Sequence, residues 1–284
     1  MLLFFLVLPA RADEPTFGTT KSVEQAEKPV THLAATLGGT LTSGNTESLV
    51  VNGGITASHH WLRNELGLAA GLNEGVGAVD ANADGYLAGA ERCFGVGPCA
   101  KTAERLSAEV RYDRFLTEHA SIYVLVGALH DPFVGFAHRE HGQLGYAYTL
   151  LDTKADRLRA ELGADLANEQ YVVGVAPSWT HLLAAQVGVQ YTHTFNDAVA
   201  FGDALTAYEP VLTQPEGQNF ALYLTDVRLT NEASITARAG ESLGIRLTDS
   251  LAWRNEPIAA PAGVAGTRAA LDNTVSITLV ASLL

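Results

Sequence analysis

Apolar and polar residues alternate along much of the chain, and residues 157–166 show the pattern most clearly. The even positions there are Leu158, Ala160, Leu162, Ala164 and Leu166, and the odd positions are Arg157, Arg159, Glu161, Gly163 and Asp165. Because successive side chains of a β-strand point to opposite faces, such a segment has one apolar face and one polar face. The pattern predicts an all-β protein.

The same alternation recurs in about twelve segments of roughly 10–14 residues each. In all of them, small polar residues occupy the alternate positions between the apolar ones. This pattern is typical of a closed barrel whose apolar face lies in lipid and whose polar face lines the interior. A soluble barrel would instead have its apolar side chains inside. The expected strands are His32–Thr42, a segment ending near Ser58, Leu62–Leu72, Ala103–Tyr112, Ser121–Leu129, Gln143–Leu150, Ala155–Ala167, Leu183–Thr194, Ala198–Tyr208, Ala221–Glu232, Glu241–Trp253 and Asn273–Leu284.

The connections between these segments alternate in length. Short ones are expected at residues 60–61, 116–119, 152–155, 196–197 and 237–240, and long ones at 73–102, 130–142, 168–181, 209–219 and 255–272. Short periplasmic turns against long outer loops are the outer-membrane pattern. We therefore expect a transmembrane antiparallel up-and-down β-barrel over residues 31–284.

The N-terminal residues indicate export. Leu2–Leu8 is apolar, and Ala10-Arg11-Ala12 gives the small-x-small cleavage pattern, so residues 1–12 are expected to be a signal peptide. Residues 13–30 are polar and are expected to be a disordered periplasmic lead-in. No segment approaches the ~20 consecutive apolar residues of a membrane helix. We expect the mature chain in the outer membrane of a Gram-negative bacterium.

Composition narrows the function further. The chain has 47% hydrophobic and 17% charged residues and a formal net charge of −13, and this acidic balance argues against nucleic acid as a partner.

Four stretches carry a family resemblance: Gly38–Ser48, Arg111–Phe136, Leu144–Thr153 and the closing segment from Trp253. On these residues the chain resembles the YdiY-like family of salt-induced outer-membrane proteins, whose function is not established. The resemblance implies an outer-membrane β-barrel and leaves the activity open. The partners expected from it are outer-membrane lipid and the barrel assembly machinery.

One predicted outer loop matches the twelve-residue calcium pattern D-x-[DN]-x-[DN]-G-x5-E, which places oxygen ligands at alternate positions and a carboxylate at position twelve. The ligands would be Asp80, Asn82, Asp84, the backbone carbonyl of Tyr86, and Glu91. No helical pattern flanks the loop, so a calcium site here would be weak. The alternative is an acidic, glycine-rich surface loop that matches by chance.

The two cysteines lie close together beside that loop. Cys93 and Cys99 enclose the turn-prone sequence FGVGP. In an oxidising compartment such a pair is expected to close a small disulfide loop.

Charged residues occupy many of the alternate strand positions that are expected to point into the barrel. Buried charges must be paired or hydrated. If they pair across strands they fill the lumen, and if they are hydrated they line a pore, for which about twelve strands leave room. The candidate lumen-lining residues are Arg63, Glu65, Arg105, Glu109, Arg111, Arg157, Arg159, Glu161, Asp165, Asp226, Arg228 and Arg246.

The sequence shows few features of an enzyme. The motif G-x-S-x-G is absent, and the nearby arginines favour ion pairing of Glu161 and Asp165 over acid catalysis. We expect a non-enzymatic protein, either a narrow passive channel or an envelope-structural protein with a stress role. It needs no cofactor to fold, with calcium as a possible ligand. The alternatives are an outer-membrane enzyme acting on lipid or peptide and a cation-binding surface module.

Overall fold

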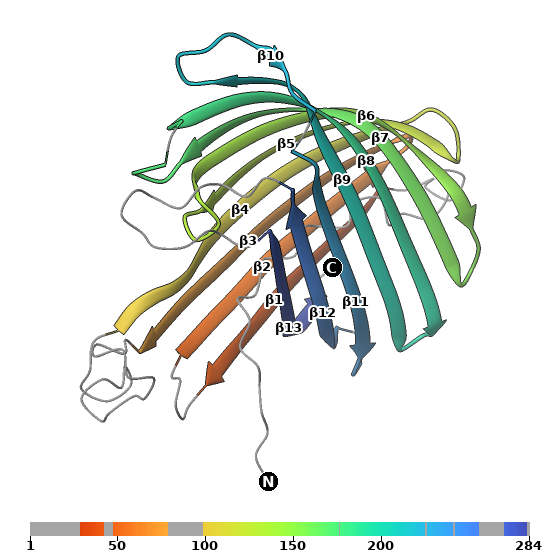
Figure 1. Ribbon diagram of the computed structural model, residues 1–284. Coiled ribbons are helices and arrows are strands. Elements are labelled where there is room, and N and C mark those ends of the chain that lie inside the picture. Colours follow the sequence, from red (N-terminus) through yellow and green to blue (C-terminus); the bar gives the residue numbers. More distant parts are fainter. Residues whose placement is uncertain are drawn as a thin grey trace.

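The computed structural model describes residues 29–42, 48–78, 99–175, 177–224, 226–240, 242–255 and 270–282. Twelve long antiparallel strands in this part of the chain close into a barrel, because β13 pairs with β1 (Figure 1). No helix in the described ranges is long and apolar enough to cross a membrane. The long strands are β1 Val30–Thr42, β2 Ser48–Trp61, β3 Asn64–Ala78, β4 Cys99–Phe115, β5 Ala120–Asp131, β6 Phe136–Asp152, β7 Asp156–Tyr171, β8 Trp179–Asn196, β9 Val199–Pro215, β11 Arg228–Arg238, β12 Leu243–Arg254 and β13 Leu271–Ser282, and the two-residue β10, Ala221–Leu222, pairs with the end of β9.

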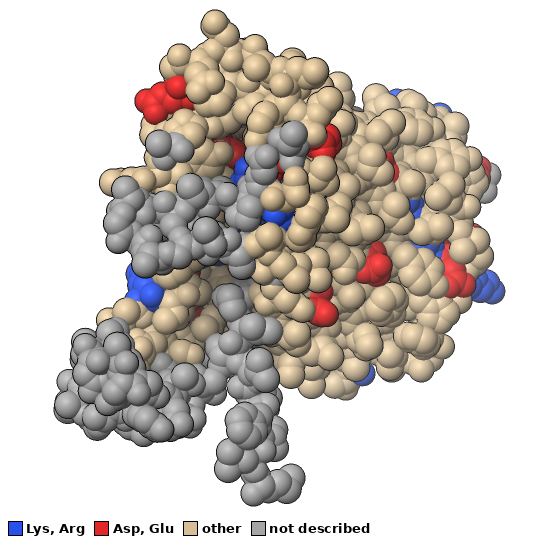
Figure 2. Space-filling view, viewed as in Figure 1, with Lys and Arg blue, Asp and Glu red and all other residues tan. Residues whose placement is uncertain are grey.

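Alternation along each strand separates an apolar outer face from a polar inner one. Leu144 on β6 and Leu162 on β7 are 64% and 62% exposed, while Gln143 and Glu161 beside them are buried. Figure 2 shows the outer face of the barrel largely free of charged side chains over the strands. The predicted all-β barrel of twelve strands is confirmed. The polar side chains of each alternating strand point into the barrel.

The predicted long loop over residues 130–142 is wrong. Strands β5 and β6 continue through most of it and are joined by the turn Pro132–Gly135, where Gly135 has a φ of 107°. Polar residues occupy both parities in His138–His141, so the alternation that marks a strand disappears there although the backbone pairing continues. The pairing of one β-strand with the next does not require an apolar face.

The predicted strand Ala221–Glu232 is also misplaced. The strand that pairs with β9 and β12 begins at Arg228 and runs to Arg238, and only Ala221–Leu222 of the preceding segment is a strand. Residues Phe220–Leu224 carry apolar side chains, which is why the sequence pattern assigns them to a barrel strand. In the structure they form an exposed extension beyond the barrel rim instead (Figure 1).

The side chain of Tyr123 lies flat on the inner face of the barrel, and it needs two glycines to do so. A Cβ atom at Gly145 on β6 would lie 2.5 Å from the Tyr123 ring, and one at Gly163 on β7 would lie 2.8 Å from its hydroxyl. The ring is 1% exposed, and the guanidinium carbon of Arg111 sits 3.9 Å from its centroid. This stacked arrangement fills the interior beside β5–β7.

We expect Gly145→Ala to destabilise the barrel by about 1–3 kcal/mol, because the added methyl group must displace the buried ring. Urea unfolding of the refolded protein in lipid vesicles measures the change. Gly188→Ala is the matched control, since its nearest contact would be an ordinary 3.6 Å from Glu161. The explanation also predicts that Gly145→Ala costs less when Tyr123→Leu removes the ring. If Gly145→Ala lowers the free energy of unfolding equally in both backgrounds, the steric explanation is wrong.

Candidate functional site

Two clusters of ion pairs lie inside the barrel. Their charged side chains come from inward positions of β4, β6, β7, β11 and β12, together with Asp226 just before β11. We call the barrel end with the short connections after β2, β4, β6, β8 and β11 the turn end, and the opposite one the loop end. The turn-end cluster is Arg111, Asp113, Arg159 and Glu161, and the loop-end cluster is Arg139, Asp165, Glu169, Asp226, Arg228 and Arg254.

The turn-end cluster joins β4 to β7 across the inner faces of β5 and β6. Arg111 donates to Asp113 at 2.7 Å through Nε and to Glu161 at 2.7 Å through Nη2. Arg159 donates to Asp113 at 2.8 Å, and the Ser121 hydroxyl donates to the same carboxylate at 3.0 Å. All four charged side chains are buried. Each charge therefore has a partner of opposite sign, as burial requires.

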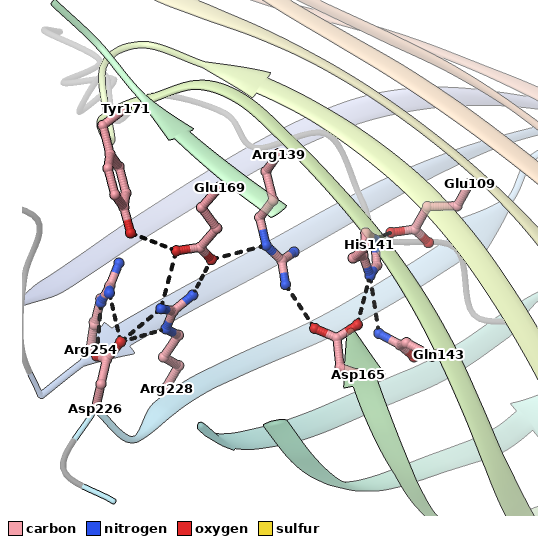
Figure 3. A network of polar contacts seen from close by, with 10 residues as sticks. All are labelled: Glu109, Arg139, His141, Gln143, Asp165, Glu169, Tyr171, Asp226, Arg228 and Arg254. Carbon is pink, nitrogen blue, oxygen red and sulfur yellow. Dashed lines mark hydrogen bonds and ion pairs between the residues drawn. The ribbon is translucent and has the colours of Figure 1, made fainter. Parts of the chain in front are cut away.

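Glu169 is the centre of the loop-end cluster (Figure 3). This fully buried carboxylate on β7 accepts hydrogen bonds from Arg139 Nε at 3.2 Å, from the Tyr171 hydroxyl at 2.9 Å and from Arg228. Arg228 also donates to Asp226 at 2.7 Å, and Arg254 donates to Asp226 at 2.6 Å. The pairs form one continuous chain from β6 to β12.

This chain of pairs joins strands that are not neighbours in the sheet. Strands β8 and β9 lie between β7 and β11, so the contact between Glu169 and Arg228 bridges their inner faces, as the turn-end cluster bridges those of β5 and β6. The two residues are 59 positions apart in the sequence. The loop-end cluster therefore ties two separate parts of the barrel to each other.

Asp165 extends the cluster toward β4. It accepts a hydrogen bond from Arg139 Nη2 at 3.1 Å and lies 3.1 Å from His141 Nδ1, while His141 Nε2 is 3.7 Å from Glu109 (Figure 3). Both Asp165 and the His141 side chain are buried. Polar contacts thus run without interruption from Glu109 on β4 to Arg254 on β12.

The remaining sequence-predicted lumen residues lie apart from this chain. Glu65 is buried on β3, Arg105 pairs with Asp131 at 3.3 Å, and Arg246 donates to the Thr236 hydroxyl at 3.1 Å. Arg157 is the second residue of β7, and its buried Nε has no hydrogen-bond partner among the described residues.

The assignment of Arg63 to the inner face is wrong. Leu62 and Arg63 form the turn between β2 and β3, with Leu62 at a φ of 49°, and Arg63 is exposed there. The predicted strand begins two residues too early, so a turn position was counted as a strand position.

Three members of the loop-end cluster are absent from the candidates. Arg139 fell in the predicted loop, and Glu169 and Arg254 lay just beyond the predicted ends of their strands. The alternation could have located Glu169. Residues 165, 167 and 169 all point inward, so continuing the strand by four residues beyond Asp165 reaches Glu169.

Many inward positions on β1–β3, β12 and β13 carry small residues. On β1 to β3 the inward positions include Thr36, Gly54 and Gly71 in one row and Gly38, Asn52 and Asn73 in the next. On β12 and β13 they include Thr248, Thr274 and Ser276. Small uncharged side chains thus line much of the inner face of these strands, with Glu65 on β3 and Arg246 on β12 among them.

The candidate calcium ligands Asp80, Asn82, Asp84, Tyr86 and Glu91 lie outside the described residues, as do Cys93 and residues 1–28. The calcium site, the disulfide with Cys99, the signal peptide and the lead-in stay predictions. Among the residues that the structure does describe, no group of three or more His, Cys, Asp or Glu side chains is arranged to hold a metal ion.

Two loops are held together at the loop end. Glu216, just after β9, accepts hydrogen bonds from Ser178 Oγ at 2.6 Å and Ser178 N at 3.1 Å. Both bonds favour the ionised carboxylate, the side-chain bond more, and they lower the pKa of Glu216.

The chain belongs to DUF481, a family of proteins of unknown function, whose model matches residues 35–280. No curated protein matches it. Among solved structures, an outer membrane channel from Pseudomonas putida F1 is similar with a TM-score of 0.50 and 9% identity, covering 95% of this chain and 100% of that one. This similarity shows the fold alone.

Two further similarities are weaker. The translocator domain of the autotransporter NalP from Neisseria meningitidis has a TM-score of 0.42 and 12% identity, over 90% of this chain and 88% of that one. The toluene transporter TodX of Pseudomonas putida has a TM-score of 0.39 and 12% identity, over 92% of this chain and 90% of that one.

We expect Asp113→Asn to destabilise the barrel by about 3 kcal/mol, because it leaves Arg111 and Arg159 buried with one carboxylate between them. Urea unfolding in vesicles measures the change. Asp156→Asn is the matched control, because Asp156 is partly exposed where it contacts His193, and little change is expected. Equal stability of the two variants would show that the turn-end cluster is hydrated rather than buried.

Proposed function

We propose that this protein is an outer-membrane β-barrel that forms a narrow passive channel for small solutes. The observation that carries the proposal is the loop-end cluster, which bridges β7 and β11 inside the barrel, while many inward positions of β1 and β2 carry small residues. A twelve-stranded barrel is wide enough for a channel, and ion pairs across it make the passage narrow.

The outer surface supports a membrane location. Large apolar side chains on the outward parity are exposed on strand after strand, including Leu68 on β3, Val126 on β5 and Ile277 on β13. In a barrel, backbone hydrogen bonds are satisfied between neighbouring strands, which is what a hydrocarbon environment demands. The barrel architecture, shared with an outer membrane channel, is consistent with this location. The lipid and the assembly machinery of that membrane are the expected partners.

The balance of charge inside suggests weak ion selectivity. The turn-end cluster holds two arginines and two carboxylates, and the loop-end cluster holds three of each. Each cluster is therefore formally neutral, before His141 is counted. A passage beside neutral clusters lacks the single-sign ring of charge that selects cations or anions.

An envelope-structural role is the second candidate, and complete pairing of the charges favours it. If no water passes beside the clusters, the ion pairs act as internal cross-links and the function lies in the barrel wall or the loops. A catalytic role has no support of this kind from the described residues.

We expect Leu162→Arg to destabilise the barrel by about 2–4 kcal/mol, because its outward position halfway along β7 places the charge in the bilayer core. Phe195→Arg, also an exposed apolar position but at the turn end of β8, is expected to cost about 0–1 kcal/mol. Urea unfolding in vesicles compares them. Equal costs would argue against a membrane-spanning orientation.

Single-channel conductance in a planar bilayer tests the channel directly. Wild type is expected to give small discrete steps. Glu169→Gln is expected to enlarge the steps and shift selectivity toward anions, since it removes the ion pair with Arg228, which Asp226 still binds, and leaves one positive charge in excess. Glu74→Gln is the matched control, because Glu74 pairs with Lys101 on the exposed face, and it should behave like wild type.

The outcomes separate the two candidates. A silent wild type with a conducting Glu169→Gln variant would mean that the clusters close the barrel, which favours the structural role. Silence of both proteins, with the fold verified, would refute the channel.

A further inference from the structure

One buried histidine lies between two carboxylates inside the barrel. His141 on β6 places Nδ1 3.1 Å from the Asp165 carboxylate on β7 and Nε2 3.7 Å from the Glu109 carboxylate on β4 (Figure 3). The side chains of His141 and Asp165 are 7% and 1% exposed, and that of Glu109 is 17% exposed. We call these three residues the histidine bridge. Glu109 is its most accessible member.

A glycine on β5 lets the imidazole reach across that strand. Glu109, Gly127 and His141 lie directly opposite one another on β4, β5 and β6. A Cβ atom at Gly127 would overlap His141 Nε2 and would lie 3.0 Å from Glu109 Cγ. Because this position has no side chain, the ring and the carboxylate can meet over the inner face of β5.

The two carboxylates of the histidine bridge differ in their other partners. Asp165 also accepts a hydrogen bond from Arg139 Nη2 at 3.1 Å. Arg111 is only two positions from Glu109 on β4, but it donates to the carboxylates of the turn-end cluster instead. Among the described residues, the charged contact of Glu109 is with His141. The negative charge of Glu109 is therefore compensated only when His141 carries a second proton.

The protonation state of the ring decides which carboxylates it can satisfy. A neutral imidazole has one N–H donor and one acceptor nitrogen, whereas an imidazolium has two donors. Ionised carboxylates only accept hydrogen bonds, so a neutral His141 suits one of its two neighbours and an imidazolium suits both. Asp165 keeps Arg139 in either state. Glu109 is therefore the carboxylate that is left without a donor when the ring is neutral.

Few other charges face the ring. Within the described strands, the charged groups around His141 are Glu109 on β4, Asp165 on β7 and Arg139 on β6 itself, while β5 presents Gly127 at this level. An arginine stays protonated in proteins, and histidine is the side chain whose charge ordinarily changes near neutral pH. Uptake or loss of a proton at His141 thus changes the charge beside Glu109 by one unit.

We propose that the histidine bridge sets the ion selectivity of the channel and that a proton on His141 switches it. When the ring is neutral, the Glu109 carboxylate is an uncompensated negative charge at the lumen, which favours cations. When the ring is protonated, the pair is neutral and the preference is lost. Both ion-pair clusters are formally neutral, so this one charge decides the sign of the selectivity. The proposal rests on the channel function and deepens it.

Reversal potentials in a planar bilayer under a salt gradient test the switch, with the refolded full chain studied at pH values from about 5 to 8. The wild type is expected to prefer cations at the alkaline end and to lose that preference as the pH falls. Imidazole NMR of the same protein in nanodiscs follows the proton on His141, whose signal is assigned by its loss in His141→Gln. The NMR and selectivity curves should have the same midpoint.

Variants of the two residues separate their charges. His141→Gln can still donate to Asp165 but takes up no proton, so it should prefer cations at every pH. Glu109→Gln removes the negative charge, so it should show no preference at the alkaline end and prefer anions at the acidic end. The double variant should have a cation-to-anion permeability ratio of about one throughout, because neither charge remains.

His138→Gln is the matched control. His138 lies on the same strand but is partly exposed, 2.8 Å from Glu140, and it belongs to neither the histidine bridge nor the clusters. This variant should follow the wild-type curve. Heat-shifted migration on gels verifies that each variant is folded.

Three results would overturn the switch: pH-dependent selectivity that His141→Gln retains, selectivity that stays constant while His141 titrates, and an imidazole signal that does not titrate over this range. A conducting wild type with any of these results refutes the switch alone and leaves the channel standing. A silent wild type, with its fold verified, refutes the channel and the switch with it.

Discussion

The interior of this barrel depends on the requirement that buried charges be paired. Glu169 is fully buried, and it can be ionised there because arginines reach it from β6 on one side and from β11 on the other. Since the strands that supply these arginines are not neighbours, the pairing holds the barrel in a particular cross-section. The backbone hydrogen bonds of the sheet close the barrel, but they leave the shape of its lumen undetermined.

Side-chain size divides the interior into sectors. Tyr123 lies flat because Gly145 and Gly163 leave room for it, and Arg111 packs over its ring. Many inner positions of β1–β3 and β13 carry glycine, alanine, serine, threonine or asparagine instead, although Val50, His60 and Glu65 also lie there.

The sequence by itself determined the fold class, the strand number and the inner and outer faces, because side-chain direction in a strand follows from position alone. Leu162 and Glu161 could be placed on opposite faces without a structure. The strand ends were harder to find, since polar residues at His138–His141 and Glu169 occupy regions beyond the apolar band. The partners of the inward charges were decided by tertiary structure alone. Pairing of Glu169 with Arg228, or of β1 with β13 only as far as Gly38, depends on how the barrel curves and closes, and local pattern carries no information on either.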